Sequence, residues 1–359
     1  MNKDVYFIKK TFRLAKRAQG FTSPNPLVGA LIVKNNKVIS FGYHHRCGLP
    51  HAEIEAIRKV EKQSIKGAKL YVNLEPCYHF GRTPPCVDEI IKVGIKEVVI
   101  ATLDPNPRVN GKSIKKLQKA GIKVKVGVCE EQAVQLNEVF FTNIKKKRSF
   151  IVAKIAQSLD GKIATAKGIS KWITCQRSRV FAKSLRDKYD AVLVGVNTVI
   201  VDNPSLNGSK KRPYKIVIDP NLRIPLKSNL VSKDCRKLIV FASYKSRSRK
   251  LPELKNIFFV KEVKGKLDLK EIVKRLYSLG IMSVFVEGGS TTIGRFFDSE
   301  LVDKAHFFIS PKIIGGSAAL SSIGGQGVVS PNHCVSLKSI RKRQLDEDIL
   351  ITGYPFYEG

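Results

Sequence analysis

The chain has 359 residues, with 64 Lys and Arg against 30 Asp and Glu, so its formal net charge at pH 7 is +34. A chain of this length is too long for one ordinary hydrophobic core and predicts two domains. No apolar run approaches membrane-spanning length, and the N-terminus Met1-Asn2-Lys3-Asp4 leads into an amphipathic segment rather than a secretory signal. We therefore expect a cytoplasmic protein.

Strands and helices alternate along the first part of the chain. Apolar runs over 27–33 and 38–43 flank the turn Lys34-Asn35-Asn36-Lys37 and predict a hairpin. Beyond it, the spacing of apolar residues predicts helices near 51–62, 86–93, 111–120 and 130–139 and strands over 68–74, 97–101 and 122–128. This pattern predicts a three-layer α/β/α domain over residues 1–143.

A basic stretch follows these elements. Helical periodicity stops there, and a new strand begins at Phe150-Ile-Val-Ala-Lys-Ile155. Residues 144–149 are therefore expected to be a linker, and residues 150–359 a second α/β domain.

Three fragments of the first domain contain residues that bind zinc. They are His51-Ala52-Glu53, Glu75-Pro76-Cys77 and Pro84-Pro85-Cys86. One imidazole and two thiolates give zinc three protein ligands and leave a fourth position for water, which is typical of a catalytic site. We predict His51, Cys77 and Cys86 as the ligands of one Zn²⁺ ion.

Glu53 has the position of a proton shuttle. Zinc lowers the pKa of bound water to about 7, so hydroxide is available to attack an electron-poor ring carbon. A carboxylate beside the metal can take the proton of the water and pass it to the departing ammonia, so Glu53 is the predicted catalytic residue. His-x-Glu followed by Pro-Cys is the signature of zinc-dependent nucleobase deaminases.

The spacing of the two cysteines departs from the common Pro-Cys-x-x-Cys form, because eight residues lie between Cys77 and Cys86. With seven cysteines in the chain, a chance pair is one interpretation. Against it, Cys86 follows two prolines and opens a predicted helix, where the dipole and free N–H groups favour a thiolate. The remaining cysteines, Cys47, Cys129, Cys175, Cys235 and Cys334, are expected to be packing residues in a reducing compartment.

The inserted stretch Glu75-Pro-Cys-Tyr-His-Phe-Gly-Arg-Thr-Pro-Pro-Cys86 resembles the bifunctional riboflavin-biosynthesis deaminase/reductase family, as do Pro24-Asn25-Pro26-Leu27-Val28-Gly29 and Asp104-Pro105-Asn106-Pro107. The resemblance implies a cytidine-deaminase-like N-terminal domain that acts on a diaminopyrimidine ribosyl phosphate. It implies that Asn25 contacts the pyrimidine and that His79 lies near the substrate. Alternatively, Asn25 is only a turn residue and His79 is solvated.

The second half contains no zinc-type cluster and no Gly-x-Gly-x-x-Gly after its first strand. Its recognisable segments are 158–164, 168–174, 195–206 and 286–292. The last of these, Val286-Glu-Gly-Gly-Ser-Thr-Thr292, predicts a strand that leads through a glycine turn into a helix, whose free N–H groups can hold a phosphate.

These segments resemble the reductase domain of the same family, which has a dihydrofolate-reductase-like α/β fold and uses NADPH. The resemblance implies NADPH contacts from Ala156, Trp172, Thr198, Asp202, Gly289, Ser290, Thr291, Thr292, Ile293, Gly294 and Arg295. It implies substrate contacts from Ser170, Arg186, Leu206 and Glu287. The alternatives are that Trp172 is a core residue, that Arg186 lies on a solvated helix face, and that the glycines form only a turn.

One position departs from the family pattern. Where the family places an arginine three residues after Leu206, this chain continues Asn207-Gly208-Ser209-Lys210-Lys211-Arg212. The phosphate contact has either moved to Lys210 or Arg212 or been lost. Asp202 is a candidate for positioning or proton supply, although structural hydrogen bonding would also explain it.

The high positive charge leaves other functions open. A tRNA deaminase fused to an unrelated domain, a nucleic-acid-binding protein with a structural zinc, and a degenerate homologue with one active domain are the alternatives. Lysines are spread over both halves, with only two short basic clusters, at 145–148 and 243–250. We therefore expect a phosphorylated pyrimidine substrate rather than nucleic acid, and no membrane partner. The sequence leaves open whether the protein is a homo-oligomer.

Overall fold

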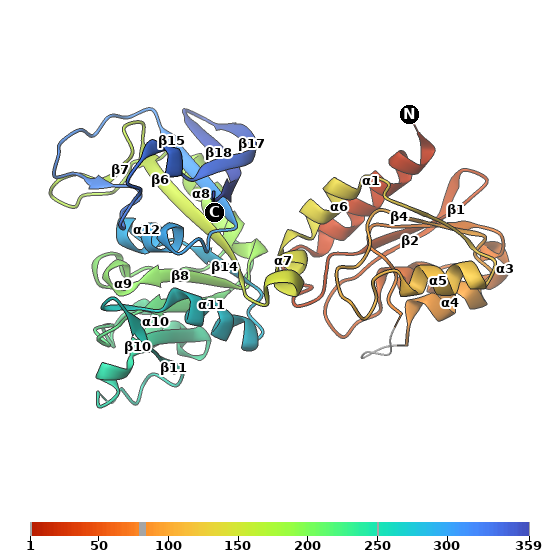
Figure 1. Ribbon diagram of the computed structural model, residues 1–359, viewed down its shortest axis with the longest axis horizontal. Coiled ribbons are helices and arrows are strands. Elements are labelled where there is room, and N and C mark those ends of the chain that lie inside the picture. The colour runs from red at the N-terminus through yellow and green to blue at the C-terminus, as the bar shows by residue number, and fades with distance from the viewer. Residues whose placement is uncertain (1, 79–83, 250, 359) are drawn as a thin grey trace. The chain divides into compact units, whose positions relative to one another are not determined.

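The computed structural model describes residues 2–78, 84–249 and 251–358 (Figure 1). The chain folds into two compact units, Met1–Lys147 and Arg148–Gly359. Within the described residues, no helix is both long and apolar enough to span a membrane.

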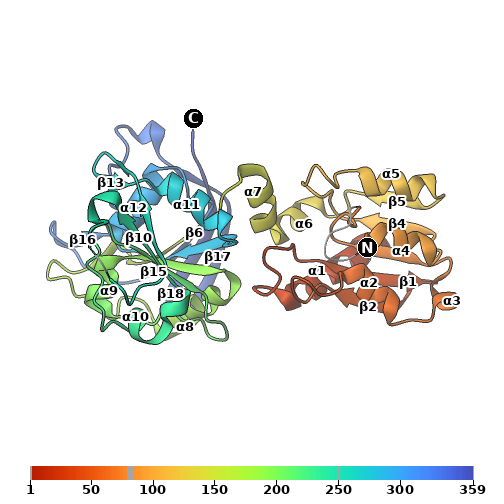
Figure 2. The same ribbon diagram turned by 90° about the horizontal axis from the view of Figure 1, so that it is seen from below.

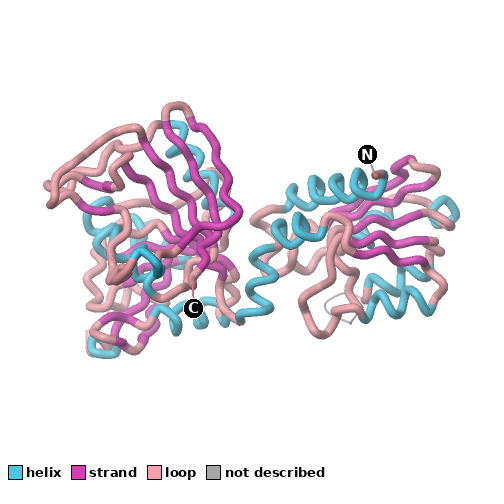
Figure 3. The backbone as a smooth tube through the Cα atoms, turned by 45° about the horizontal axis from the view of Figure 1, so that its top comes forward, coloured by secondary structure: helices cyan, strands magenta, loops and turns pink. Residues whose placement is uncertain are grey.

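The first unit contains one mixed sheet of five strands in the order β2-β1-β3-β4-β5. Figure 3 shows the strands in magenta and the helices in cyan. The hairpin strands β1 (Gly29–Lys34) and β2 (Lys37–Tyr43) are antiparallel, and β1 is also antiparallel to β3 (Lys69–Val72). The strands β4 (Glu97–Ile100) and β5 (Lys123–Val126) continue the sheet in parallel with β3.

Helices cover both faces of this sheet. Alternate strand residues such as Ile32 and Leu70 pack on one face in a core with α2 (Ala52–Arg58), α4 (Cys86–Lys92) and α5 (Lys112–Lys119). The intervening residues, such as Leu31 and Val99, pack against α1 (Lys3–Ala15) and α6 (Glu130–Leu136) on the other face. The period of two along each strand therefore produces the predicted three-layer arrangement.

Two long predicted helices are interrupted. The predicted helix 51–62 ends early, because α2 stops at Arg58 and a separate short helix, α3 (Lys62–Ile65), begins only at residue 62. The predicted helix 130–139 is divided between α6 and α7 (Glu138–Lys146). Asn137 stands at the second break, where its side chain accepts a hydrogen bond from Leu27 N at 2.7 Å and donates one to Leu27 O at 3.0 Å. A tertiary contact thus overrides helical periodicity at this point.

The segment expected as a linker is mostly structured. Helix α7 continues to Lys146, and the boundary between the two units falls after Lys147. Arg148 is buried, and its guanidinium pairs with both carboxylate oxygens of Asp303 at 2.6 and 2.9 Å. Arg148 therefore belongs to the second unit, because a two-pronged ion pair holds it there.

The second unit contains a nine-stranded sheet in the order β11-β10-β9-β8-β14-β6-β15-β18-β17. Its strands are β6 (Phe150–Ser158), β8 (Ala191–Gly195), β9 (Tyr214–Ile218), β10 (Leu238–Ser243), β11 (Ile257–Val260), β14 (Ser283–Val286), β15 (Lys304–Ser310), β17 (Ser336–Leu345) and β18 (Asp348–Phe356). Two-stranded ribbons pair β7 (Lys162–Ala164) with β16 (Leu320–Ser321) and β12 (Glu262–Val263) with β13 (Lys266–Leu267). The strands from β11 to β15 run in parallel, whereas β18 is antiparallel to both of its neighbours.

Helices α11 (Leu269–Ser278) and α12 (Ser290–Asp298) pack on one face of this sheet (Figure 2). The other face is covered by α9 (Val196–Asp202) and α10 (Asn229–Asp234), and α8 (Gln176–Leu185) brings Phe181 against Phe308 of β15. Parallel strands align their carboxyl ends at one edge, so the turns after β14, β8, β9 and β10 lie next to one another there.

Candidate functional site

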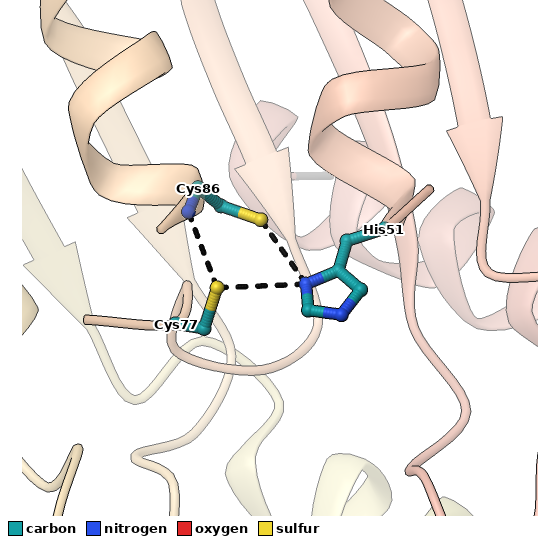
Figure 4. Close-up of side chains that lie close together, drawn as sticks. All are labelled: His51, Cys77 and Cys86. Atoms are coloured by element: carbon teal, nitrogen blue, oxygen red, sulfur yellow. Dashed lines mark hydrogen bonds between the residues drawn. The ribbon is translucent and has the colours of Figure 1, made fainter. Parts of the chain in front are cut away.

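The three predicted zinc ligands come together in the first unit (Figure 4). His51 is the N-cap residue of α2, Cys77 lies in the loop after β3, and Cys86 is the first residue of α4. The Nδ1 atom of His51 is 3.2 Å from Cys86 Sγ and 3.5 Å from Cys77 Sγ. The backbone N–H of Cys86 donates to Cys77 Sγ at 3.2 Å.

These distances fit a tetrahedral zinc site. Zinc–sulfur bonds of about 2.3 Å and zinc–nitrogen bonds of about 2.0 Å put neighbouring donor atoms about 3.5 Å apart. Hydrogen bonding from Cys86, and after it from His51, holds the pKa of Cys77 well below its usual range. The donor set is therefore that of a three-ligand site with one vertex open, and the chance pairing of the two cysteines is excluded.

Glu53 lies in the first turn of α2, next to these ligands. Its side chain is 3% exposed, and its Oε2 atom is buried without a hydrogen-bond partner among the described residues. Burial raises the pKa of Glu53 to about 7. A buried carboxylate oxygen without a partner beside three metal ligands fits a water held at the open vertex.

A cavity of about 350 Å³ opens beside this group. It is lined by His51, Glu53 and Cys77 together with Asn25 and Asp104. The three sequence segments that carry the family resemblance, which are far apart along the chain, thus meet around one hollow. A cavity of this volume is in the range of small-molecule sites.

Asn25 is held in place at the wall of the cavity. Its Nδ2 atom is 3.0 Å from His44 Nε2, and His44 Nδ1 is 3.1 Å from Pro50 O. His44 and Phe140, which the sequence did not single out, also line the cavity, as does Cys47, which was expected to be a packing residue. The cluster His44-His45-Arg46-Cys47, shortly before His51, was the sequence feature that could have indicated His44 and Cys47. His79, the other predicted substrate contact, lies outside the described residues.

Glu75 fixes the opposite wall. Its carboxylate accepts hydrogen bonds from Asp104 N at 3.2 Å, Gly111 N at 3.0 Å and Ser113 Oγ at 2.5 Å. The Glu75-Pro-Cys motif therefore holds the Asp-Pro-Asn-Pro loop and the start of α5 next to Cys77.

In the second unit, two predicted substrate residues form an ion pair. The guanidinium of Arg186 donates to both oxygens of Glu287, with Nε–Oε1 at 2.5 Å and Nη2–Oε2 at 3.0 Å. Arg186 also donates to Asn207 O at 2.9 Å, next to Leu206. Burial opposes ionisation of Glu287, but Arg186 outweighs it and lowers the pKa of this carboxyl. Arg186 is therefore not on a solvated helix face.

Lys154 of β6 joins this pair, and sequence reasoning missed it. Its Nζ atom is 3.9 Å from Glu287 Oε2, and burial lowers the pKa of its ammonium group. In the sequence, Lys154 is the one charged residue of an otherwise apolar strand, and this was the available signal. Two cations and one carboxylate thus share a mostly buried site, which fits an anionic ligand.

The glycine turn leads into α12 as predicted. Gly289 is the N-cap residue of α12, and Ser290, Thr291 and Thr292 form its first turn. The later residues of the predicted cofactor segment pack within the unit, and their cofactor contacts stay predictions. Ile293 is 1% exposed in the core, Gly294 packs against the backbone of Gly324, and Arg295 donates to Leu267 O.

The other predicted cofactor and substrate residues are dispersed around this edge. Trp172 is 63% exposed, which excludes a core role, and the Arg179 guanidinium lies 4.4 Å from its ring centroid. Lys171, next to Trp172, is 3.6 Å from Asp202 Oδ1. Ser170 is exposed, Ala156 and Thr198 are half-buried, and the Leu206 side chain is 3% exposed in the core.

The segment that departs from the family pattern is bound by Asp187. Its carboxylate accepts the backbone N–H groups of Ser209, Lys210 and Lys211 at 2.9–3.2 Å. The Lys211 ammonium turns inward and donates to Tyr189 O at 3.2 Å. Lys210 and Arg212 are exposed, so these two cations remain the candidates for a displaced phosphate contact.

Comparisons with known proteins match each of the two units to a known family. Residues 1–102 match the cytidine and deoxycytidylate deaminase zinc-binding region, and residues 149–351 match the RibD C-terminal domain. The chain is 45% identical over 352 residues to the riboflavin biosynthesis protein RibD of Aquifex aeolicus, with 97% of each chain covered. It is 37% identical over 331 residues to RibD of Escherichia coli, with 88% of this chain and 89% of that one covered.

Among solved structures, the chain resembles a diaminohydroxyphosphoribosylaminopyrimidine deaminase/5-amino-6-(5-phosphoribosylamino)uracil reductase from Thermotoga maritima. The TM-score is 0.88 at 36% identity, and 99% of each chain is covered. The fold and the zinc ligands define an α/β enzyme in which a zinc-dependent deaminase domain is joined to a reductase domain.

The chain belongs to the RibD family. It is a bifunctional deaminase and reductase of riboflavin biosynthesis, with Zn²⁺ as the cofactor of the first activity and NADPH as that of the second. The predicted fold class and family are therefore confirmed.

Proposed function

We propose that this enzyme deaminates 2,5-diamino-6-ribosylamino-4(3H)-pyrimidinone 5′-phosphate and then reduces the ribosyl chain of the product to ribityl. The name of the similar Thermotoga maritima protein supplies the substrates. The observation that carries the proposal is the convergence of Asn25, Glu53 and Asp104 around one cavity beside the three metal ligands. The first reaction replaces a ring amine by oxygen, consuming water and releasing ammonia.

In the deaminase site, His51, Cys77 and Cys86 hold the metal. Bound there, zinc supplies hydroxide at neutral pH. Glu53 takes the proton of the attacking water through its unpartnered Oε2 and passes it to the ring nitrogen and then to the departing amine. Asn25, oriented by His44, hydrogen-bonds the pyrimidine. His79 is a further proposed substrate contact.

In the reductase site, Lys154, Arg186 and Glu287 lie at the reacting end of the substrate. NADPH supplies the hydride. The buried Lys154 ammonium gives a proton to the ribose ring oxygen as the C1–O bond breaks, and C1 of the resulting iminium ion accepts the hydride, which leaves a secondary amine. Arg186, held by Glu287, orients the substrate, and the 5′-phosphate extends toward the exposed Lys210 and Arg212.

The proposed cofactor contacts in this unit lie along the edge that carries the glycine turn. The backbone of Gly289, Ser290 and Thr291 binds the pyrophosphate at the start of α12. Trp172, Asp202, Ala156 and Thr198 border the rest of the dinucleotide, as proposed from the family resemblance. Ser170 and the backbone of Leu206 are proposed substrate contacts.

The cytoplasm is the proposed location, and a phosphorylated pyrimidine is the proposed partner. All seven cysteines are free, which favours a reducing compartment. A positive field attracts a phosphorylated substrate as well as nucleic acid, so the charge of +34 does not by itself favour a tRNA substrate.

The test is mass spectrometry of the products formed by the zinc-loaded enzyme from the diaminopyrimidine substrate, with and without NADPH. We expect the deaminated product alone without NADPH, and the reduced product only when NADPH is added. Recovery of unchanged substrate in both samples, together with deamination of a tRNA or a free nucleoside, would overturn the proposal in favour of a nucleic-acid deaminase.

A further inference from the structure

Part of the deaminase cavity is built by a segment that neither matched family region covers. Those regions are 1–102 and 149–351, whereas Phe140 of α7 is one of the residues that line the cavity. The Phe140 side chain is half-buried, and among the described residues neither hydrophobic core of the first unit includes it. Core packing therefore does not account for the place of this ring.

The place of Phe140 is set by the helix break at Asn137. Asn137 lies between α6 and α7 with φ −109° and ψ 26°, outside the helical range. Figure 2 shows the two helices as separate coils. An unbroken helix would continue along α6, whose Ala133 is buried in the core beside the sheet. The break therefore decides where the Phe140 ring lies.

Two buried amides connect this break to the segment that carries Asn25. Asn137 and Asn73 are 3% and 0% exposed. The Asn137 side chain accepts from Leu27 N at 2.7 Å and donates to Leu27 O at 3.0 Å. The Asn73 side chain donates to the same oxygen at 2.8 Å and accepts from Gly29 N at 2.7 Å. Both lone pairs of the Leu27 carbonyl are thus used, and its backbone is held on two sides.

This clamp fixes Phe140 and Asn25 relative to each other. Asn25 precedes Leu27 by two residues, and the intervening Pro26 has a fixed φ. Phe140 follows Asn137 by three residues, which is less than one turn of a helix. Short, stiff stretches of chain therefore join the clamp to a hydrogen-bonding side chain on one side and to an aromatic side chain on the other.

The two side chains suit the two ways in which enzymes hold a nucleobase. Such enzymes read the edge of the ring by hydrogen bonds and pack its face against aromatic or apolar side chains. Asn25 is the proposed edge contact. Among the described residues that line the cavity, the rings are those of His44, His51 and Phe140. His51 is a metal ligand and His44 contacts Asn25 and Pro50, so Phe140 is the ring left for the face of a base.

We propose that the pyrimidine ring of the substrate stacks on Phe140, and that Asn137 is a positioning residue that holds Phe140 in register with Asn25. The inference rests on the proposed pyrimidine substrate, and it adds the residues that hold the face of its ring. A stacking contact stabilises the bound substrate and the transition state alike, so its loss should raise KM and leave kcat unchanged.

The test is steady-state deamination of the diaminopyrimidine substrate by the zinc-loaded full chain. Phe140→Ala is expected to raise KM by about 10- to 100-fold, the effect of one base–aromatic stack, with kcat within about twofold of wild type. Phe140→Tyr keeps the ring and should restore KM, whereas Phe140→Leu keeps only apolar bulk and should give an intermediate KM.

A double variant tests the role of Asn137. Asn137→Ala should raise KM without loss of zinc. In the Phe140→Ala background it should raise KM by a smaller factor, because part of its effect depends on the Phe140 ring. Equal factors in the two backgrounds would show that Asn137 does not act through Phe140 and would overturn its positioning role.

Phe141→Ala is the matched control, because Phe141 is the next residue of α7, is also half-buried and is not among the described residues that line the cavity. It should leave KM and kcat unchanged, and unaltered zinc content in each variant verifies that the first unit is folded. Equal KM values for Phe140→Ala and Phe141→Ala overturn the stacking contact and leave the deaminase assignment standing. A wild-type enzyme that leaves the diaminopyrimidine unchanged overturns the proposed function itself.

Discussion

The guanidinium of Arg186 and the carboxylate of Glu287 form a two-pronged ion pair, with contacts of 2.5 and 3.0 Å between residues 101 positions apart. Their side chains are 19% and 10% exposed, so water contributes little to the solvation of either charge. Lys154, at 3.9 Å from Glu287, depends on the same carboxylate. Glu287 thus balances two cations from β6 and the segment after α8.

Removal of this carboxylate charge should damage the reductase unit. In Glu287→Gln, Arg186 and Lys154 face each other without a counter-charge, and breaking a buried pair costs about 3–5 kcal/mol. We expect a lower melting temperature for the second unit and at least a 10-fold slower reduction of the deaminated substrate. Calorimetry and NADPH oxidation measure these two effects.

The control for this variant is Asp346→Asn, which removes the partner of Arg177 in an ion pair whose two side chains are 58% and 48% exposed. An exposed ion pair contributes little, so stability and reduction should stay at the wild-type level. If Glu287→Gln behaved like this control, the ion pair would have no role in the site.

Zinc removal should separate the two activities. Cys86→Ser deletes a soft thiolate ligand, so the purified variant should carry less than one zinc per chain and lose deamination. Reduction of the already deaminated substrate should continue, because the reductase residues lie in the other unit. Metal analysis measures the zinc content of the variant, and separate assays of deamination and of reduction measure its two activities. Cys334→Ser, at an exposed cysteine, should keep both zinc and activity.

The sequence predicted most elements of the first unit and three side chains that the structure brings together as a possible metal site, because both depend on local patterns. The hairpin around Lys34-Asn35-Asn36-Lys37 and the helix that begins at Cys86 lie where expected. The predicted helix 130–139 was wrong, because the helix breaks at Asn137. The Asn137 side chain binds Leu27, which lies 110 residues away, and such a contact leaves no trace in local periodicity.

The same limit applies to the sites. Zinc ligands have restricted residue types and spacings, so His51, Cys77 and Cys86 could be recognised before the fold was known. The cluster of Lys154, Arg186 and Glu287 comes from three separate elements, and only the order of the strands brings it together. The guanidinium of Arg295 donates to Leu267 O, and the cofactor contact that the family resemblance implies for Arg295 stays a prediction.

Loss of the Glu75 carboxylate should loosen one wall of the deaminase cavity. In Glu75→Ala, the N–H groups of Asp104 and Gly111 and the hydroxyl of Ser113 lose their acceptor. We expect KM for deamination to rise about 10-fold, with zinc content unchanged, because Glu75 positions the loop and does not bind the metal. A variant with wild-type KM would show that the loop keeps its position without Glu75.

His306 should make the second unit less stable in acid. Burial lowers the pKa of His306 to about 3, so the native state excludes a proton that the unfolded chain takes up below its ordinary pKa of 6.5. Stability is therefore lost as pH falls from about 6.5 toward 3, by at most about 1.4 kcal/mol per pH unit for this one group.

His306→Gln removes this titration and keeps a polar partner for Thr352, which His306 Nδ1 contacts at 2.8 Å. Denaturant unfolding at pH 7 and pH 5 measures the difference. The wild-type chain should lose more stability than His306→Gln between these two pH values. Equal losses would show that His306 contributes nothing to the acid sensitivity.

The central claim, two successive reactions at separate sites of one chain, is tested most directly by complementation between Glu53→Gln and Lys154→Ala. Glu53→Gln should retain zinc and leave the diaminopyrimidine substrate unchanged, whereas Lys154→Ala should stop at the deaminated product. With NADPH present, a mixture of the two variants should form the reduced product, detected by mass spectrometry. Reduced product from either variant alone, or none from the mixture although each retains its other activity, would contradict the account.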